Sequence, residues 1–266
     1  MTDFPAIHRS APPWNGLKTA AIGCVSFGDP DTGADFLRSA CDTLRGEGFG
    51  AVVGPMDGNT WGRYRIAAWS DGSPAFTMEP GAGPHDLAAY GAAGFHVAER
   101  HFSATAAVGS RGWSDAGSGM AVSSWDGSRP EALLADAHAV AMAAFRDTDF
   151  FTPVPRAAFV AAYLPLLGRA DPRFILAARD ASGRPVGFTF AFPDPSRRGA
   201  VVLKTYAGLV PGAGRRMADR IHGLAAEAGH TEVVHALIRQ GIASEAQSRK
   251  FGGRVFRRYQ LMGRRL

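Results

Sequence analysis

Apolar residues along the chain occur in two patterns: short unbroken runs typical of buried strands, and three-to-four-residue spacings typical of amphipathic helices. Thr19–Phe27 and Phe49–Gly54 are unbroken runs, whereas Ala34–Arg45 places its apolar residues at helical spacing. Clusters drawn from 33 glycines and 17 prolines separate the segments, as in a chain of many short elements. The pattern predicts strands at 19–27, 49–54, 63–69, 94–107, 120–125, 174–179, 185–192, 200–209, 231–237 and 254–262, and helices at 34–45, 84–93, 131–145, 156–167, 215–228 and 243–251.

This alternation predicts an α/β protein built on a mixed sheet. A length of 266 residues fits either one large domain or two small ones. Val108–Gly119 is rich in glycine and serine, which is typical of a linker. We therefore expect a first unit over residues 1–107, a linker over 108–119 and a second unit over 120–266.

The net charge of +5 is a local feature of the chain. Residues 249–266 contain seven basic side chains and no acidic one, and the preceding residues carry 22 basic and 24 acidic side chains. A protein that coats nucleic acid with its whole surface is therefore not expected.

Cysteine content and hydropathy exclude further classes. Two cysteines, Cys24 and Cys41, do not make a disulfide framework, and no Cys/His spacing indicates a metal site. No run of 18 apolar residues occurs, and residues 1–18 lack the apolar stretch of a signal peptide. The sequence therefore predicts a soluble, cytoplasmic protein without a metal or a membrane partner.

The stretch with the clearest chemistry joins a predicted strand directly to a predicted helix. Leu209-Val210-Pro211 ends the strand, and Gly212-Ala213-Gly214 leads into the helix with Arg215 and Arg216 in its first turn. The two glycines allow a bulky group to approach the backbone, and a helix N-terminus attracts anions. The alternative is an ordinary strand-to-helix turn with two solvated arginines.

The order of elements from Met120 onwards resembles the GNAT superfamily of acyl-CoA-dependent N-acyltransferases. In that family the pyrophosphate loop reads Arg/Gln-x-x-Gly-x-Gly/Ala; Gly212-Ala213-Gly214 and Met217 match its latter part, but the leading Arg or Gln is absent and the loop is shorter. Other blocks resemble one bacterial branch of GNAT-like proteins, namely Val53-Gly54-Pro55-Met56-Asp57-Gly58, Thr60-Trp61, Tyr64-Arg65, Phe151-Thr152-Pro153, Gly187-Phe188, Lys204-Thr205, His235-Ala236-Leu237 and Arg257-Arg258-Tyr259.

The resemblance implies a GNAT-like fold in two tandem halves, the first incomplete and degenerate. The first half looks like a copy that begins at the fourth strand, so Gly28–Gly33 stands where the second half has its glycine loop. Asp29 and Asp31 in that segment would repel a pyrophosphate. The first half is then structural or shapes the substrate site.

The resemblance also implies acetyl-CoA, or another acyl-CoA, as cofactor. The backbone of Gly208, Leu209 and Val210 would bond the pantetheine amides. The pyrophosphate would lie on the N–H groups of Gly212, Ala213, Gly214, Arg215, Arg216 and Met217. By the same likeness the helix over 244–251 flanks the cofactor groove. Some of the C-terminal basic side chains would there balance the negative charge of CoA.

Four residues are candidates for proton transfer. Many GNAT enzymes have a tyrosine in the short helix after the fifth strand; Ser248 stands there, so Tyr259 or Tyr206 is the alternative acid. His235 on the fifth strand is the candidate base. Each has a plainer alternative, a packed tyrosine or a hydrogen-bonded core histidine.

Asp57, Trp61, Tyr64 and Arg65 are the candidates for the substrate pocket, because acidic, aromatic and basic groups crowd one short stretch. The alternative is a contact between the two halves made of stacked Trp and Arg.

Three functions remain open at this stage. The leading hypothesis is an acyl-CoA-dependent N-acyltransferase that acts on the amine of a small molecule. The alternatives are an aminoacyl-tRNA-dependent transferase with a tandem GNAT-like fold and a non-catalytic module that binds CoA. A nucleic-acid partner is expected under the tRNA alternative alone. A homodimer is possible, since another chain could supply the missing early strands of the first half.

Overall fold

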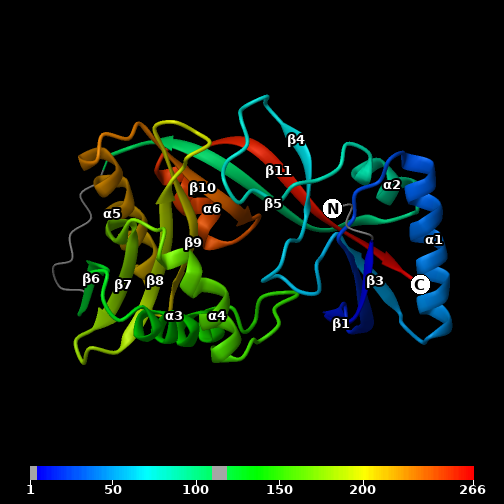
Figure 1. The fold of residues 1–266 in the computed structure, drawn as a ribbon, viewed down its shortest axis with the longest axis horizontal. Coiled ribbons are helices and arrows are strands. Elements are labelled where there is room, and N and C mark those ends of the chain that lie inside the picture. The colour runs from blue at the N-terminus through cyan, green and yellow to red at the C-terminus, as the bar shows by residue number, and fades with distance from the viewer. Residues whose placement is uncertain (1–4, 110–118) are drawn as a thin grey trace.

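A long mixed sheet runs through the molecule, with helices packed on both of its faces (Figure 1). The computed structural model describes residues 5–109 and 119–266, called here the first and second halves. The elements are β1 (Ala6–Trp14), β2 (Leu17–Gly23), α1 (Pro30–Gly46), β3 (Ala51–Gly54), β4 (Ile66–Ser70), α2 (Asp86–Ala92), β5 (His96–Ala107), β6 (Met120–Ser124), α3 (Pro130–Ala144), α4 (Arg156–Leu167), β7 (Ile175–Asp180), β8 (Pro185–Pro193), β9 (Ala200–Gly208), α5 (Ala213–Glu227), β10 (Glu232–Arg239), α6 (Ala243–Lys250) and β11 (Arg254–Arg265). A short 3-10 turn over Pro172–Phe174 precedes β7.

Each predicted strand and helix is present, with ends displaced by a few residues. The sequence analysis missed β1. Pro12 and Pro13 lie inside it and break the apolar run by which a strand is recognised. Proline is tolerated there because β1 is an edge strand that pairs with β2 on one side, and an edge leaves backbone N–H positions unused.

The central feature of the sheet is an exchange of strands between the halves. The order is β1-β2-β3-β11-β5-β10-β9-β8-β7-β6, with β4 also paired to β11. Thus β5, from the first half, pairs with β10 of the second, and β11, from the second half, pairs with β3 of the first. β5 and β11 lie side by side in the middle and pair antiparallel from Arg254↔Thr105 to Gly263↔His96.

The two halves also repeat one motif, as the fold prediction requires. In the first half β2 and β3 pair in parallel and α1 connects them; in the second half β9 and β10 pair in parallel around α5. The second half adds β6, β7 and β8 before this unit, whereas the first half has β1 there. The first half is therefore the shorter copy.

Each group of helices covers its own part of the sheet. α1 and α2 bury Leu37, Leu44 and Tyr90 against the first half. α5 buries Met217 and Ile221 against one face of the second half, and α3 and α4 pack on the other face around Leu134 and Phe159. Burial of such side chains contributes about 1.5–3 kcal/mol each.

The predicted division into two units with a linker stays a prediction, because residues 110–118 of the linker lie outside the described residues. In the described chain no helix combines the length and apolar character needed to cross a bilayer. The described residues also hold no cluster of three or more His, Cys, Asp or Glu side chains suited to a metal ion.

The exchanged strands predict that the halves lose stability together. Phe256 on β11 is fully buried against Phe76 of the first half and strands of the second. We expect Phe256→Ala to lower the free energy of unfolding by about 3–5 kcal/mol, and Ile242→Ala, at an exposed position, by less than about 1 kcal/mol. Hydrogen exchange should rise in α1 and α5 alike; a rise confined to one half would contradict the coupling.

Candidate active site

The sheet opens between β9 and β10 partway along their length. Their parallel pairing runs from Ala200↔Glu232 to Leu203↔His235 and then stops. β9 continues to pair with β8 as far as Gly208, and β10 continues with β5 as far as Arg239. Backbone groups of the two strands beyond Leu203 therefore face an opening instead of each other.

Two irregularities of the sheet mark the opening. The pairing of β8 with β9 shifts between Phe190 and Ala191, which leaves Lys204 as the extra residue of a bulge. The pairing of β10 with β5 shifts after His235, where Leu237 has a left-handed φ of 57°. Ser103 Oγ accepts from the Leu237 amide at 3.0 Å, and Arg65 Nη1 donates to the Leu237 carbonyl at 3.1 Å, so two residues of the first half hold this bulge of the second half. Bulges redirect side chains and are frequent beside active sites.

The helix after β9 begins without a side-chain cap. Gly212 is the N-cap residue, with a φ of 86° that favours glycine, and the first turn of α5 contains no acidic residue. Gly208 packs closely, since a Cβ there would lie 2.7 Å from the Cβ of Ala213. The end of β9 therefore runs directly against the start of α5, and the N-terminus of the helix presents its positive end next to the opening.

The corresponding helix of the first half is closed by its own carboxylate. Asp29 caps α1, and its Oδ1 accepts from the backbone N of Thr32 at 2.8 Å. The hydrogen bonds from Thr32 lower the pKa of Asp29, so the carboxylate stays ionised at neutral pH. The sequence analysis expected the carboxylates in Gly28–Gly33 to repel a pyrophosphate. In the structure one of them, Asp29, already occupies the N-terminus of α1.

A cavity of about 600 Å³ lies at the opening and takes its walls from both halves. We call it the central cavity. The second half contributes β9, β10, the start of α6 and the segment between α3 and α4, and the first half contributes the loop after β3, the segment after β4 and strand β5. The lining includes Trp61, Arg63, Tyr64, Arg65, Met78, Glu79, Glu99, His101, Asp149, Tyr163, Lys204, Thr205, Tyr206, Leu237, Arg239 and Ser244.

Comparison with known proteins identifies the architecture. A scan against protein-family models found no match, and neither did a search of curated protein sequences. Solved structures do match. A GCN5-related N-acetyltransferase from Sphaerobacter thermophilus superposes on 93% of this chain and 73% of its own with a TM-score of 0.58 and 13% identity. One from Anabaena variabilis gives 0.57 over 98% of this chain and 58% of its own, at 11% identity. A tandem GNAT protein from the clavulanic acid biosynthesis pathway gives 0.53 over 94% and 76%, at 13% identity.

This chain has the GNAT fold. The likeness extends over nearly the whole chain and includes a protein with two GNAT units, which agrees with the two β-α-β motifs described above.

Within this GNAT fold the central cavity contains a buried acidic group. The Glu99 side chain is 9% exposed; its Oε1 lies 3.0 Å from Arg239 Nε, and its Oε2 lies 3.2 Å from His101 Nε2. Burial raises the pKa of Glu99 to about 6, although Arg239 and Arg65 act in the opposite direction. Burial and the same two arginines lower the pKa of His101, so that it is neutral at pH 7. A carboxylate with such a pKa can take and release a proton near neutral pH.

Tyr64 and Arg65 support this acidic group from behind. The Arg65 guanidinium lies over the Tyr64 ring at 3.7 Å from its centroid, and the ring meets His101 edge-on. Arg65 is 6% exposed, and its left-handed φ of 70° turns the side chain toward β10. The sequence analysis proposed both residues for the substrate pocket, and both lie on the lining of the central cavity.

Trp61 also lines the central cavity, whereas Asp57 is not among its lining residues. Trp61 donates through Nε1 to the Thr152 carbonyl at 2.7 Å and meets the Phe159 ring edge-on. Trp61 therefore connects the two halves beside the pocket, through Thr152 and Phe159 and not through the stacked arginine of the alternative. The Asp57 carboxylate accepts from the Cys24 amide at 2.6 Å and from Arg63 at 3.2 Å, and so fixes the loop after β3.

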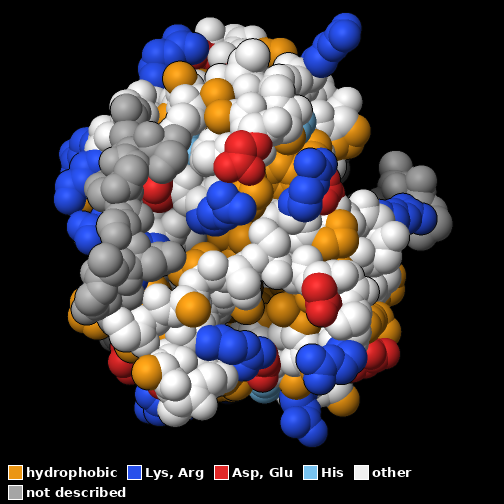
Figure 2. Space-filling view, turned by 90° about the vertical axis from the view of Figure 1, so that its left-hand side faces the viewer, with side chains coloured by type: hydrophobic (Ala, Val, Ile, Leu, Met, Phe, Trp, Pro, Cys, Tyr) orange, Lys and Arg blue, Asp and Glu red, His pale blue; other side chains and the backbone are white. Residues whose placement is uncertain are grey.

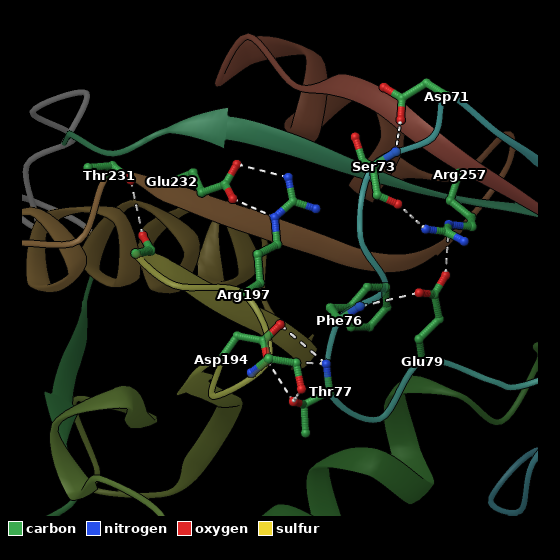
Figure 3. Close-up of polar contacts among 12 residues, drawn as sticks. Asp71, Ser73, Phe76, Thr77, Glu79, Asp194, Arg197, Thr231, Glu232 and Arg257 are labelled. Atoms are coloured by element: carbon green, nitrogen blue, oxygen red, sulfur yellow. Dashed lines mark hydrogen bonds and ion pairs between the residues drawn. The ribbon is translucent and has the colours of Figure 1, made fainter.

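Polar contacts hold the segment after β4 on either side of residue 78 (Figure 3). Thr77 Oγ1 donates to Asp194 at 2.6 Å, near the turn between β8 and β9. Glu79 lies 3.2 Å from Arg257 and accepts from the Tyr259 hydroxyl. Between these anchors Met78 adopts a φ of 67° and reaches the lining of the cavity.

His235 and Ser248, predicted as base and acid, lie together in the core and do not line the central cavity. His235 Nδ1 is 2.8 Å from Ser248 Oγ, and His235 Nε2 is 2.9 Å from His222 Nε2. Phe251 stacks on His222 with centroids 4.0 Å apart. Burial, reinforced by His222, lowers the pKa of His235 to about 3. His235 is thus neutral at pH 7, and the cluster is a hydrogen-bonded core contact between β10, α5 and α6.

Tyr259 is likewise buried, 1% exposed, with its hydroxyl bonded to Glu79 and 3.1 Å from Ser103 Oγ. Burial and Glu79 raise its pKa. It is not among the lining residues, whereas Tyr206, its alternative, is. Tyr259 therefore stands one layer behind the cavity, where it holds the segment after β4 and the bulge at Leu237.

Several of the C-terminal basic residues lie on β11, against the first half. Four of the arginines on β11 contact residues 69–93 of the first half: Arg254 lies near Asp71, Arg257 near Ser73 and Glu79, Arg258 over Trp69 and Arg264 near the Ala93 carbonyl. On the end of the molecule that carries α5 and β6, the Lys and Arg side chains drawn are dispersed among acidic and hydrophobic ones (Figure 2). Much of the basic excess joins the two halves.

The sequence analysis missed Glu99, Arg239 and Lys204 as lining residues. Glu99 and His101 carried a signal, because two polar residues two apart on a strand share one face. Lys204 and Arg239 carried none, since their position depends on bulges and on strand pairing that the sequence does not specify.

The His235 cluster predicts an acid-sensitive fold. A His with a depressed pKa is neutral when folded and takes up a proton on unfolding, so the stability it contributes is present above pH 6.5 and declines as pH falls toward 3. Between pH 6.5 and 5 the free energy of unfolding of the wild type should therefore fall, and in His235→Gln this fall should be smaller by about 1.5 kcal/mol. Urea unfolding at the two pH values measures the difference. The exposed His96→Gln variant should retain the wild-type slope; equal slopes in all three proteins would contradict the assignment.

Proposed function

We propose that this chain is an acyl-CoA-dependent N-acyltransferase that transfers an acyl group, such as acetyl, to the amine of a small molecule. The observation that carries the proposal is the uncapped N-terminus of α5 beside the opening between β9 and β10, with the central cavity at the same opening. The GNAT fold supports it as the architecture of the N-acetyltransferases named above.

The residues at the opening fit the proposed donor. The α5 N-terminus has no side-chain cap and no acid in its first turn, and Arg215 and Arg216 lie there. Gly214 would become crowded with a side chain, because a Cβ would lie 3.1 Å from the Tyr206 ring. The N–H groups from Gly212 to Met217 would hold the pyrophosphate, and the backbone of Gly208, Leu209 and Val210 would face the pantetheine. The thioester supplies an activated acyl group, and transfer to the amine releases the CoA thiol.

The first half would contribute the base. A substrate amine is protonated at neutral pH and must lose a proton before it attacks a carbonyl. Glu99 lines the cavity, and its pKa of about 6 leaves it ionised at pH 7–8, so it can accept that proton. Arg239 holds the carboxylate in place and also pairs with Asp149 at 2.8 Å. In this mechanism His235, Ser248 and Tyr259 position neighbouring strands.

Ligand-dependent melting tests the donor. We expect acetyl-CoA at 100 times its dissociation constant to raise the melting temperature by about 5 °C or more, since binding at that ratio stabilises by about 2.7 kcal/mol. Gly214→Glu should abolish the shift, because it adds a carboxylate at the α5 N-terminus. Asp29→Asn, the matched change at α1, should preserve it.

Two other results would change the functional class. A shift with charged tRNA but not with acetyl-CoA would favour an aminoacyl-tRNA-dependent transferase. A shift with acetyl-CoA but no thiol release with any of a panel of primary amines would indicate a CoA-binding module. Sedimentation of the same samples would test the homodimer.

The base makes a separate kinetic prediction. With an amine that the wild type acetylates, Glu99→Gln should lower kcat by about 10²–10⁴-fold and remove the rise in kcat through pH 6. Asp42→Asn, an exposed change on α1, is the control. A Glu99→Gln variant with the wild-type rate and pH profile would exclude Glu99 as the base.

A further inference from the structure

A second, apolar cavity adjoins the central cavity. It measures about 150 Å³ and lies between helices α3 and α4 and strands β7 and β8; we call it the aromatic pocket. Its walls include Leu133, Leu134, Ala137, Phe159, Leu167, Ile175, Leu176, Phe188 and Phe190, and it shares Trp61, Met78, Tyr163, Lys204 and Thr205 with the central cavity. A cavity of this size with apolar walls accommodates a benzene-sized group.

The charges around the two cavities are almost all balanced inside the protein. Arg63 pairs with Asp57, Glu79 with Arg257, and Glu99 and Asp149 share Arg239. Arg65 bonds the Leu237 carbonyl and lies over Tyr64. Within the described residues, Lys204 is the charged lining residue that has neither a hydrogen bond nor an ion pair with another side chain or the backbone.

Lys204 owes its direction to the bulge in β9. Phe190 pairs with Thr205 and Ala191 with Leu203, so Lys204 is inserted between residues that face opposite sides of the sheet. Lys204 and Thr205 both line the two cavities. The bulge therefore places a cation at the junction of a polar cavity with an apolar one.

Burial, with some repulsion from Arg65, lowers the pKa of Lys204 to about 8. The residue is still mostly protonated at pH 7. A partly buried ammonium without a partner is costly, and a ligand anion would restore the lost interaction.

We propose that the acceptor carries, besides its amine, an anionic group such as a carboxylate that pairs with Lys204 and a compact apolar group that fills the aromatic pocket. This deepens the proposed function and rests on it. An apolar α-amino acid has the three groups. An acyl chain would use the apolar walls but gain nothing from the cation, which is why the acceptor is the favoured occupant.

Binding of simple probes tests the recognition without turnover. We expect phenylacetate to bind at least tenfold more tightly than phenylacetamide, which lacks the charge, and than acetate, which lacks the ring. Lys204→Met should remove the preference for phenylacetate over phenylacetamide. Lys250→Met, an exposed change at the end of α6, should preserve it. Equal affinity of the wild type for acid and amide, or an unchanged preference in Lys204→Met, would overturn the proposal.

A variant that fills the aromatic pocket separates the contribution of the phenyl ring to binding from that of the carboxylate. Ala137→Met, on the α3 wall, should weaken phenylacetate at least tenfold and leave acetate unchanged. If that variant does not fold, the comparison of phenylacetate with acetate in the wild type decides the point, since equal affinities would exclude the pocket.

Turnover then connects the recognition to catalysis. With acetyl-CoA as donor, kcat/KM for L-phenylalanine should exceed that for L-phenylalaninamide and for glycine at least tenfold, and Lys204→Met should raise KM for phenylalanine more than it changes kcat. A Lys204-dependent binding of phenylacetate without any thermal shift by acetyl-CoA would refute the transferase alone. An acetyl-CoA shift with acetylation of phenylalaninamide as efficient as that of phenylalanine would refute the acceptor proposal alone.

Discussion

The antiparallel pairing of β5 with β11 is the interaction on which the rest of the molecule depends. Each strand is bonded on both edges, β5 to β10 and β11 to β3 and β4, so the hydrogen-bond ladder continues from one half into the other. Side chains on these strands take their positions from that ladder. Glu99 and His101 reach the central cavity, where they face residues of the second half, because β5 lies beside β10. Arg257 and Tyr259 anchor a first-half loop because β11 lies beside β4.

The same arrangement explains the charge distribution. Arginines on β11 meet carboxylates and carbonyls of the first half, and Arg239 at the end of β10 meets Glu99 and Asp149. The charged residues that line the central cavity have ion-pair or hydrogen-bond partners in the described structure, except Lys204. An ammonium without a partner in the protein favours a negative charge on a ligand.

Local features of the sequence were sufficient to predict the helices, the strands and the glycine loop that precedes α5. Apolar periodicity depends on residues only a few positions apart. Gly212 and Gly214 are likewise required by the local conformation and packing of the backbone. The exchange of β5 and β11 joins residues more than 140 positions apart, such as Arg254 and Thr105, and nothing in either strand's apolar pattern specifies its partner. The residues of the candidate site also fall into those that local sequence predicted and those that depend on strand pairing. Trp61, Tyr64 and Arg65 were found by their crowding, while Lys204 and Arg239 depend on bulges and register. His235 shows the opposite case, since a polar residue on a buried strand satisfied its bonds inside the core.

The capping of α1 by Asp29 has a thermodynamic consequence for the first half. The carboxylate is tethered three residues from the amide that it bonds, so it binds as an intramolecular ligand. Its effective concentration at that helix end exceeds that of a free anion in solution, and a competing phosphate would have to displace it and also overcome its charge. One side chain therefore keeps the N-terminus of α1 permanently self-occupied, whereas the N-terminus of α5 has no side-chain cap.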